Sequence, residues 1–135
     1  MILFIIYQET LYRLIKMNSL IKPIMLPNAL KLKLLGYADD SNVFIKSEND
    51  LHILYNILNI FGSATGAELN HNKTKIMGFG SWKGKTNWNA DWLVPESISI
   101  KCLGICYFNS WQDTVNTNWQ LIEEKIDKCL RVMMI

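Results

Sequence analysis

The chain has few of the residues that cross-link small proteins or bind structural zinc, with three cysteines and two histidines among 135 residues. Cys102, Cys106 and Cys129 are odd in number and lack the Cys-x-x-Cys spacing of zinc sites, and His52 and His71 are not paired with them. A disulfide framework and a zinc or redox site are therefore disfavoured. We expect buried free thiols in a reducing compartment, and surface positions for both histidines.

The sequence also lacks a hydrophobic run long enough to cross a membrane. The apolar opening Met1–Tyr7 is interrupted by Gln8 and Glu9, has no basic segment before it, and has no small-residue cleavage site after it. It is therefore neither a signal peptide nor a membrane span. These absences predict an intracellular protein, nuclear or cytoplasmic, that is not secreted and has no membrane partner.

No large excess of one charge is present, since the net charge is only +2. The charges are nevertheless unevenly distributed: residues 37–72 carry one basic and five acidic side chains, whereas residues 1–36 carry five basic and one acidic. Cations bound in the middle and a polyanion along the flanks would suit this pattern, but an ordinary solvated surface explains it too, and charge alone favours that explanation. The length fits one globular unit or a piece of one.

The most informative segment is Tyr37-Ala38-Asp39-Asp40. Leucines alternate with lysines over residues 30–34, which predicts a strand over 30–36, and a β-branched and aromatic run follows over residues 42–46, so the segment lies between two predicted strands. Because aspartate is common in turns and depleted in strands, we expect a hairpin with both carboxylates at or beside its tip. Two carboxylates this close repel each other, and a cation between them would relieve the repulsion.

Periodicity predicts the other elements and a mixed α+β fold. We expect a helix over 3–15, a helix that starts at Ser47–Asp50 and ends at Gly62, a strand over about 74–79, a long connection over 80–96, a strand or tight hairpin over 99–108 bent at Gly104, and a final helix with an apolar stripe from Trp119 to Met133. The first helix begins almost at the first residue with a wide apolar face. This suggests a chain that starts inside a larger domain and predicts poor solubility in isolation.

Several motifs resemble, in order and spacing, the reverse transcriptases of non-LTR (LINE-type) retrotransposons. Tyr37–Asp40 resembles the catalytic hairpin of that family, residues 3–15 resemble the helix before it, and Gly66–Asn70 with Lys73–Met77 resembles the next motif. Lys101–Ile105 is similar to the family's primer-gripping turn, and residues 118–126 are similar to its first thumb helix. The resemblance implies a partial α+β palm over residues 1–110, with an antiparallel sheet and catalytic hairpin packed on two helices and then a primer-grip-like hairpin. Residues 111–135 would begin the thumb.

The resemblance implies nucleotidyl transfer by two Mg²⁺ ions on an RNA template and a DNA primer with a dNTP. Asp39 and Asp40 are the implied catalytic metal ligands, because Mg²⁺ prefers hard oxygen donors. Neighbouring side chains on a strand point to opposite faces, so we expect Asp39 to be the direct ligand and Asp40 a weaker or supporting one. Tyr37 and Ala38 would lie near the primer terminus, although a buried strand tyrosine explains Tyr37 equally well.

Lysines supply the remaining implied contacts. Lys73 is expected to act as a catalytic residue near the triphosphate, with Lys75 as its rival, although a solvated lysine at a strand start is an alternative. Basic and aromatic residues interleave over residues 73–85, which suits a single strand or an RNA–DNA hybrid, whereas Trp88 and Trp92 more simply pack against their own domain. The implied nucleic-acid contacts are Tyr37, Ala38, Lys75, Lys83, Lys85, Leu103 and Gly104.

One part of the implied site has no counterpart in the sequence. The family uses a third metal-binding aspartate upstream of the first helix, and the only acid before Asp39 is Glu9, at the position of a structural glutamate in the resemblance. We therefore expect weak metal binding and no activity from the chain by itself, with the missing N-terminal part of the same polymerase as its partner. The alternative is a non-catalytic retroelement remnant with at most residual nucleic-acid binding.

Overall fold

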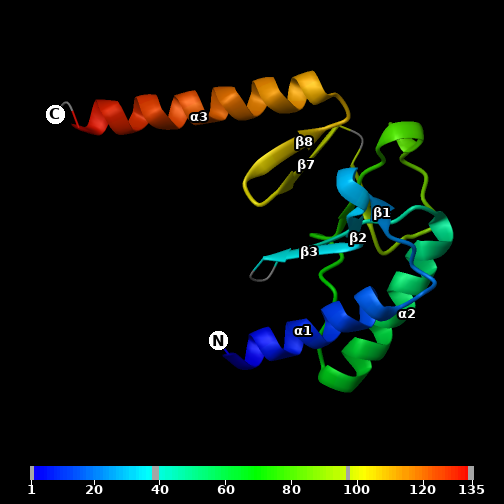
Figure 1. Cartoon of the computed structure of the whole chain (residues 1–135). Helices are drawn as coiled ribbons and strands as arrows, with labels where there is room; N and C mark the ends of the chain where they lie inside the picture. Colours follow the sequence, from blue (N-terminus) through cyan, green and yellow to red (C-terminus); the bar gives the residue numbers. More distant parts are fainter. Residues whose placement is uncertain (1, 38–39, 97, 134–135) are drawn as a thin grey trace. The chain divides into compact units, whose positions relative to one another are not determined.

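The computed structural model describes residues 2–37, 40–96 and 98–133 (Figure 1). The fold is mixed α+β, as predicted, but each sheet that the structure describes has only two strands. The chain divides into two compact units, the first comprising residues 1–74 and 88–94 and the second residues 75–87 and 95–135. The elements in chain order are α1 (Ile2–Met17), β1 (Ile24–Met25), η1 (Pro27–Ala29), β2 (Lys31–Leu32), β3 (Leu34–Tyr37), β4 (Asp40–Val43), α2 (Glu48–Thr65), β5 (Lys75–Ile76), η2 (Gly80–Trp82), β6 (Val94–Pro95), β7 (Ser99–Cys102), β8 (Ile105–Phe108) and α3 (Trp111–Met133).

Helices α1 and α2 contact each other in the first unit (Figure 1). The Tyr7 ring meets the edge of Phe61 with centroids 5.0 Å apart, and the Tyr7 hydroxyl donates a hydrogen bond to the Thr65 carbonyl over 2.6 Å. Apolar side chains at helical spacing form the buried face of α2. Burial of such a stripe is the main source of helix stability in proteins. The buried apolar residues of this unit are Ile15, Ile21, Leu34, Leu51, Leu54, Ile57, Phe61, Ala90 and Trp92.

The predicted start of α2 is confirmed, but its predicted end is wrong. Ser47 accepts a hydrogen bond from the Asp50 N–H, and the Asp50 carboxylate accepts one from the Ser47 N–H, so the two residues form a capping box. The helix continues through Gly62 to Thr65. It ends where Gly66 takes a left-handed conformation with φ 74° and donates its N–H to the Gly62 carbonyl.

The single strand predicted over residues 30–36 is broken at Lys33. Strand β2 pairs with β1, whereas β3 pairs with β4 in a separate sheet. The Lys33 ammonium donates hydrogen bonds to the carbonyls of Lys16 and Asn18 over 3.0 and 2.6 Å, at the end of α1. Helix ends leave carbonyls without intrahelical partners, and a cation there is favourable. Lys33 therefore joins the C-terminal end of α1 to the start of the β3–β4 hairpin.

Replacing Lys33 by methionine is expected to lower the free energy of unfolding by about 1 kcal/mol, because two carbonyls at the end of α1 lose a charged donor. Lys31→Met is the matched control: Lys31 is exposed, and its ammonium forms no hydrogen bond or ion pair within residues 2–37, 40–96 and 98–133. Urea unfolding followed by circular dichroism measures both variants. Equal losses of stability in the two variants would contradict a capping role for Lys33.

The connection predicted over residues 80–96 follows β5 and contains η2 and the short strand β6. The strand predicted over 74–79 is shorter than expected and covers only Lys75–Ile76. Within the first unit, Trp92 is buried and stacks on Tyr55 with centroids 5.2 Å apart, which confirms that this tryptophan packs against its own domain. Trp88 is half-buried.

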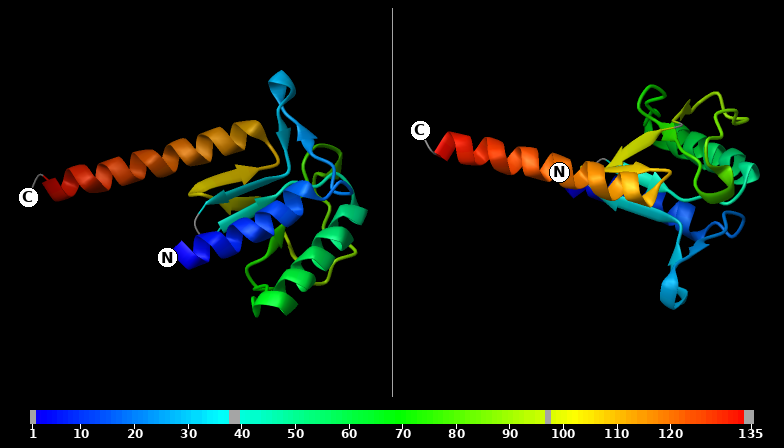
Figure 2. Two further views of the ribbon diagram at one scale, coloured as in Figure 1. Left: turned by 60° about the horizontal axis from the view of Figure 1, so that its bottom comes forward. Right: turned by 90° about the horizontal axis from the view of Figure 1, so that it is seen from above.

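In the second unit, helix α3 lies along the outer edge of the β7–β8 hairpin (Figures 1 and 2). The Asn118 side chain accepts a hydrogen bond from the Cys106 N–H over 2.9 Å and donates to the Cys106 and Thr114 carbonyls over 2.7 and 2.6 Å. One turn earlier, the Thr114 hydroxyl accepts from the Phe108 N–H over 2.9 Å. Thr114 and Asn118, which lie one turn apart on α3, therefore satisfy backbone groups of two alternate residues, Phe108 and Cys106, at the edge of β8.

The cysteines differ from the prediction of buried thiols. All three are free, but Cys102 and Cys106 are half-buried and Cys129 is exposed. Cys129 lies on α3, whose apolar stripe is largely open to solvent, since Trp119, Ile122, Ile126 and Leu130 are all exposed. Both histidines are exposed, as predicted.

The apolar face of α1 is also partly uncovered: Phe4, Ile5 and Ile6 are exposed to 49, 57 and 60%. Despite such apolar stretches, the described part of the chain contains no helix with the length and hydropathy needed to span a membrane.

Candidate active site

The candidate site is the β3–β4 hairpin, whose antiparallel register pairs Tyr37 with Asp40 and Gly36 with Ser41. The predicted hairpin at this segment is confirmed. Ala38 and Asp39, which connect the two strands, lie outside the described residues. The structure therefore locates the predicted ligand Asp40 and the predicted primer contact Tyr37 as the last described pair before the tip.

The two faces of the hairpin differ in their surroundings. Because side chains alternate along a strand, Leu34 and Gly36 share one face while Leu35 and Tyr37 share the other. Leu34 is only 6% exposed, but Leu35 and Tyr37 are 47% and 70% exposed. The explanation of Tyr37 as a buried strand tyrosine is therefore wrong. Tyr37 and its exposed partner Asp40 belong to the open face, where a ligand can reach them.

Helix α1 contacts the opposite face of the hairpin at Gly36. The Tyr12 hydroxyl lies 2.7 Å from the Ser41 hydroxyl, and the Gln8 amide donates to Tyr12 over 2.5 Å and to Ser41 over 3.4 Å. A Cβ atom at Gly36 would overlap the phenol of Tyr12, so only glycine admits the ring at this distance. None of these contacts was expected from the sequence, although a glycine inside a strand pattern indicates a close approach.

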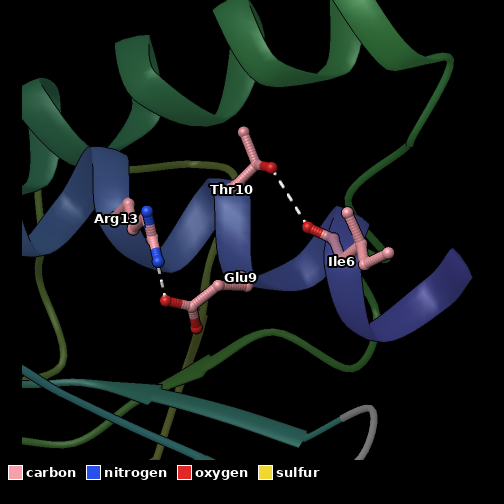
Figure 3. Close-up of polar contacts among 4 residues, drawn as sticks. All are labelled: Ile6, Glu9, Thr10 and Arg13. Atoms are coloured by element: carbon pink, nitrogen blue, oxygen red, sulfur yellow. Dashed lines mark hydrogen bonds and ion pairs between the residues drawn. The ribbon is translucent and has the colours of Figure 1, made fainter. Parts of the chain in front are cut away.

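Glu9, the only acid that precedes Asp39, is engaged within α1 (Figure 3). Its carboxylate forms an ion pair with Arg13 four residues later, with 3.0 Å between Glu9 Oε1 and Arg13 Nε. On the same helix the Thr10 hydroxyl donates to the Ile6 carbonyl over 3.1 Å, as Figure 3 shows. These contacts lie within one helix, and Glu9 has a local partner.

The two candidate triphosphate lysines differ in their partners. Lys75 forms an ion pair with Glu96, with 2.5 Å between Lys75 Nζ and Glu96 Oε1. Lys73 is exposed in a turn in which its backbone N–H donates to Asn70, and its ammonium has no partner within residues 2–37, 40–96 and 98–133. Of the two, Lys73 is therefore the lysine whose charge is available.

The other candidate nucleic-acid contacts lie in the second unit. Lys85 lies over the Trp82 ring, with 4.7 Å from its ammonium to the ring centroid, and Lys83 is exposed. Leu103 and Gly104 form the two-residue turn of the β7–β8 hairpin, with φ angles of 52° and 83°. Both positive values fit a type I′ hairpin turn, which normally favours asparagine or glycine.

A family model for reverse transcriptase (RNA-dependent DNA polymerase) matches residues 2–107 of the 135-residue chain. The chain belongs to the reverse transcriptase family. Searches of curated proteins and of solved structures found no match. The matched region includes α1, α2, the β3–β4 hairpin and nearly all of the β7–β8 hairpin.

Reverse transcriptases use divalent metal ions, and the donor chemistry of the hairpin fits that requirement. Asp40 offers an exposed carboxylate, and Mg²⁺ binds such hard oxygen donors while keeping several waters. Outside residues 1, 38–39, 97 and 134–135, no three His, Cys, Asp or Glu side chains cluster in a way that could hold a metal ion. The described part of the site therefore provides one carboxylate, to which Asp39 is the predicted neighbour.

The turn at Leu103 gives a stability prediction for this reverse transcriptase chain. A leucine held at φ 52° is strained, so Leu103→Asn is expected to raise the free energy of unfolding by about 1 kcal/mol. Gly104→Ala, at φ 83°, is the opposite control and is expected to lower it by about 1 kcal/mol. Thermal unfolding measures both changes. A loss of stability in Leu103→Asn would contradict this description of the turn.

Proposed function

We propose that this chain carries the metal-binding hairpin of an RNA-directed DNA polymerase of the non-LTR retrotransposon type. The observation that carries the proposal is the Tyr37–Asp40 pair, which the β3–β4 register holds side by side on an exposed face. The motifs at Gly66–Asn70 and Lys101–Ile105 support the retrotransposon subtype. The substrates of the complete polymerase would be an RNA template, a DNA primer and a dNTP.

Asp39 and Asp40 would hold two Mg²⁺ ions in the complete site. When bound, these ions supply activation of the primer 3′ hydroxyl and stabilise the charge on the leaving pyrophosphate. Lys73 would neutralise charge on the triphosphate, because its ammonium is exposed and lacks a partner among the described residues. Lys75 is less suited to this role, since its charge is balanced by Glu96.

The other contacts in the proposal are to the template and primer. Tyr37 and Ala38 would adjoin the primer terminus, and Leu103 and Gly104 would hold the primer end. Lys75, Lys83 and Lys85 would contact phosphates of the hybrid. In this proposal residues 1–110 form palm and residues 111–135, which include α3, begin the thumb.

A second candidate function is a non-catalytic remnant of a retroelement that retains only nucleic-acid binding. Its basis is that Glu9, the acid that precedes Asp39 in this sequence, pairs with Arg13 within α1 and so does not supply a third carboxylate at the hairpin. With two carboxylates in place of three, metal ions would bind weakly. In both candidates we propose that the 135-residue chain does not catalyse polymerisation by itself.

Primer extension tests this proposal directly. The purified chain, given Mg²⁺, an annealed RNA template and DNA primer, and dNTPs, is expected to yield no extended product. Fluorescence anisotropy with the same labelled hybrid is expected to show weak binding that declines as salt is raised. Extension that disappears in Asp39→Ala would overturn the proposed inactivity, and an absence of hybrid binding at low salt would contradict both candidate functions.

A further inference from the structure

We infer that Tyr12 is a positioning residue for the metal-binding hairpin, and that it acts through the hydroxyl of Ser41. The inference rests on the proposed function, because it assigns a role to Tyr12 only if Asp40 binds a divalent cation. Ser41 directly follows Asp40 in β4, and its partner Gly36 directly precedes Tyr37 in β3. Contacts at Ser41 and Gly36 therefore act on the residue pair that directly adjoins the Tyr37–Asp40 pair.

The hairpin needs such support because its sheet has only two strands, β3 and β4, among the described residues. An isolated two-stranded hairpin is marginally stable in water and can twist or fray. On the face turned to α1, the Tyr12 ring lies against the backbone of Gly36, and its hydroxyl meets Ser41 at 2.7 Å. Helix α1 thus packs on one face of the hairpin, which is one of the ways in which a two-stranded hairpin becomes stable.

Gln8 fixes the orientation of this contact. It lies one turn before Tyr12 on α1, and its side-chain amide donates to the hydroxyl oxygens of both Tyr12 and Ser41. A ring that is bonded at its hydroxyl and packed on a glycine has little freedom to turn away. Because strand side chains alternate, holding Ser41 on one face keeps Asp40 directed to the other, where the metal ion would bind.

The helix offers a matched control at Tyr7. Its hydroxyl donates to the Thr65 carbonyl at the end of α2, so Tyr7→Phe removes a hydroxyl from the same helix without touching the hairpin. Tyr12→Phe removes the hydroxyl that meets Ser41 and leaves the ring on Gly36. Ser41→Ala removes the hydroxyl on the β4 side of this contact, whereas Ser41→Thr keeps a hydroxyl at that position.

The test is a titration of the ¹⁵N-labelled chain with Mn²⁺ alone, a paramagnetic ion that takes the same oxygen ligands as Mg²⁺. Binding is read from the broadening of the amide signals of Tyr37, Asp40 and Ser41. Tyr12→Phe and Ser41→Ala are each expected to weaken Mn²⁺ binding about three- to tenfold, the effect of one hydrogen bond. The double variant is expected to be no weaker than either single one, and Ser41→Thr is expected to bind within about twofold of the unsubstituted chain.

Tyr7→Phe is expected to lower the melting temperature without changing Mn²⁺ affinity, which separates positioning from general stability. If Tyr12→Phe binds Mn²⁺ as tightly as the unsubstituted chain, while Asp40→Asn does not bind it, the inference about Tyr12 fails and the proposed function stands. If the unsubstituted chain shows no broadening at the hairpin, the proposed function fails and the inference fails with it. Equal losses of affinity in Tyr7→Phe and Tyr12→Phe would also overturn the inference.

Discussion

Asn118→Ala is expected to lower the free energy of unfolding of the second unit by about 2 to 3 kcal/mol. The substitution leaves the N–H and carbonyl of Cys106 without their side-chain partner at the part-buried edge of β8, and it also removes the bond to the Thr114 carbonyl. Unsatisfied backbone groups that are shielded from water cost more than the net value of a single hydrogen bond. The β7–β8 hairpin would then lose its main polar attachment to α3.

Asn116→Ala is the control for this prediction. Asn116 lies on the same helix and is exposed, and its one side-chain hydrogen bond to another described residue is the one it accepts from Gln112 over 3.1 Å. Its replacement is expected to change stability by less than about 0.5 kcal/mol. Urea unfolding and amide hydrogen exchange of β8 measure the two variants. If Asn118→Ala is no more destabilising than Asn116→Ala, the edge contact does not hold the hairpin to α3.

Gly36→Ala is expected to have the second large effect, with a loss of about 1 to 3 kcal/mol. The added methyl group would overlap the phenol of Tyr12, so the ring must leave its place and the bond to Ser41 must break. The cost therefore arises from an incompatibility between two side chains and not from the strand backbone, since Gly36 has no positive φ angle.

A double-mutant cycle checks this origin. Tyr12→Ala removes the phenol, so in the Gly36→Ala background the second substitution is expected to cost less than it does in the unsubstituted chain. The coupling is measured from urea unfolding of the two single variants and the double variant. Additive losses would show that Gly36 and Tyr12 do not interact, and would contradict the contact between α1 and β3.

The parts of the fold that follow from local pattern were predictable from the sequence. Ser47 and Asp50 indicated the start of α2, and the acidic segment after a strand pattern indicated the β3–β4 hairpin; both are confirmed. The break at Lys33 was not predictable, because it depends on the carbonyls at the end of α1, which are distant in sequence. Glycine commonly ends helices, so the pattern predicts an end at Gly62, yet the N–H of Gly66 satisfies a terminal carbonyl of the helix instead.

The candidate site shows the same division. Motif order and spacing predict a reverse transcriptase, which the match over residues 2–107 confirms, and they indicate Asp40 and Tyr37. The non-LTR subtype stays a prediction. The roles of Asp39, Asp40 and the lysines remain predictions. The contacts of Tyr12 and Gln8 with Ser41 arise from tertiary packing of a helix on a hairpin, which no periodicity reports.

In the proposed function, the β3–β4 hairpin binds divalent cations through its adjacent aspartates. Mn²⁺ titration of the ¹⁵N-labelled chain beside Asp40→Asn tests it most directly, because asparagine keeps the size of the side chain and removes its charge. The unsubstituted chain is expected to show signal broadening centred on Tyr37 and Asp40, and Asp40→Asn is expected to abolish it. Broadening centred elsewhere, or broadening at the hairpin that is unchanged in Asp40→Asn, would contradict it.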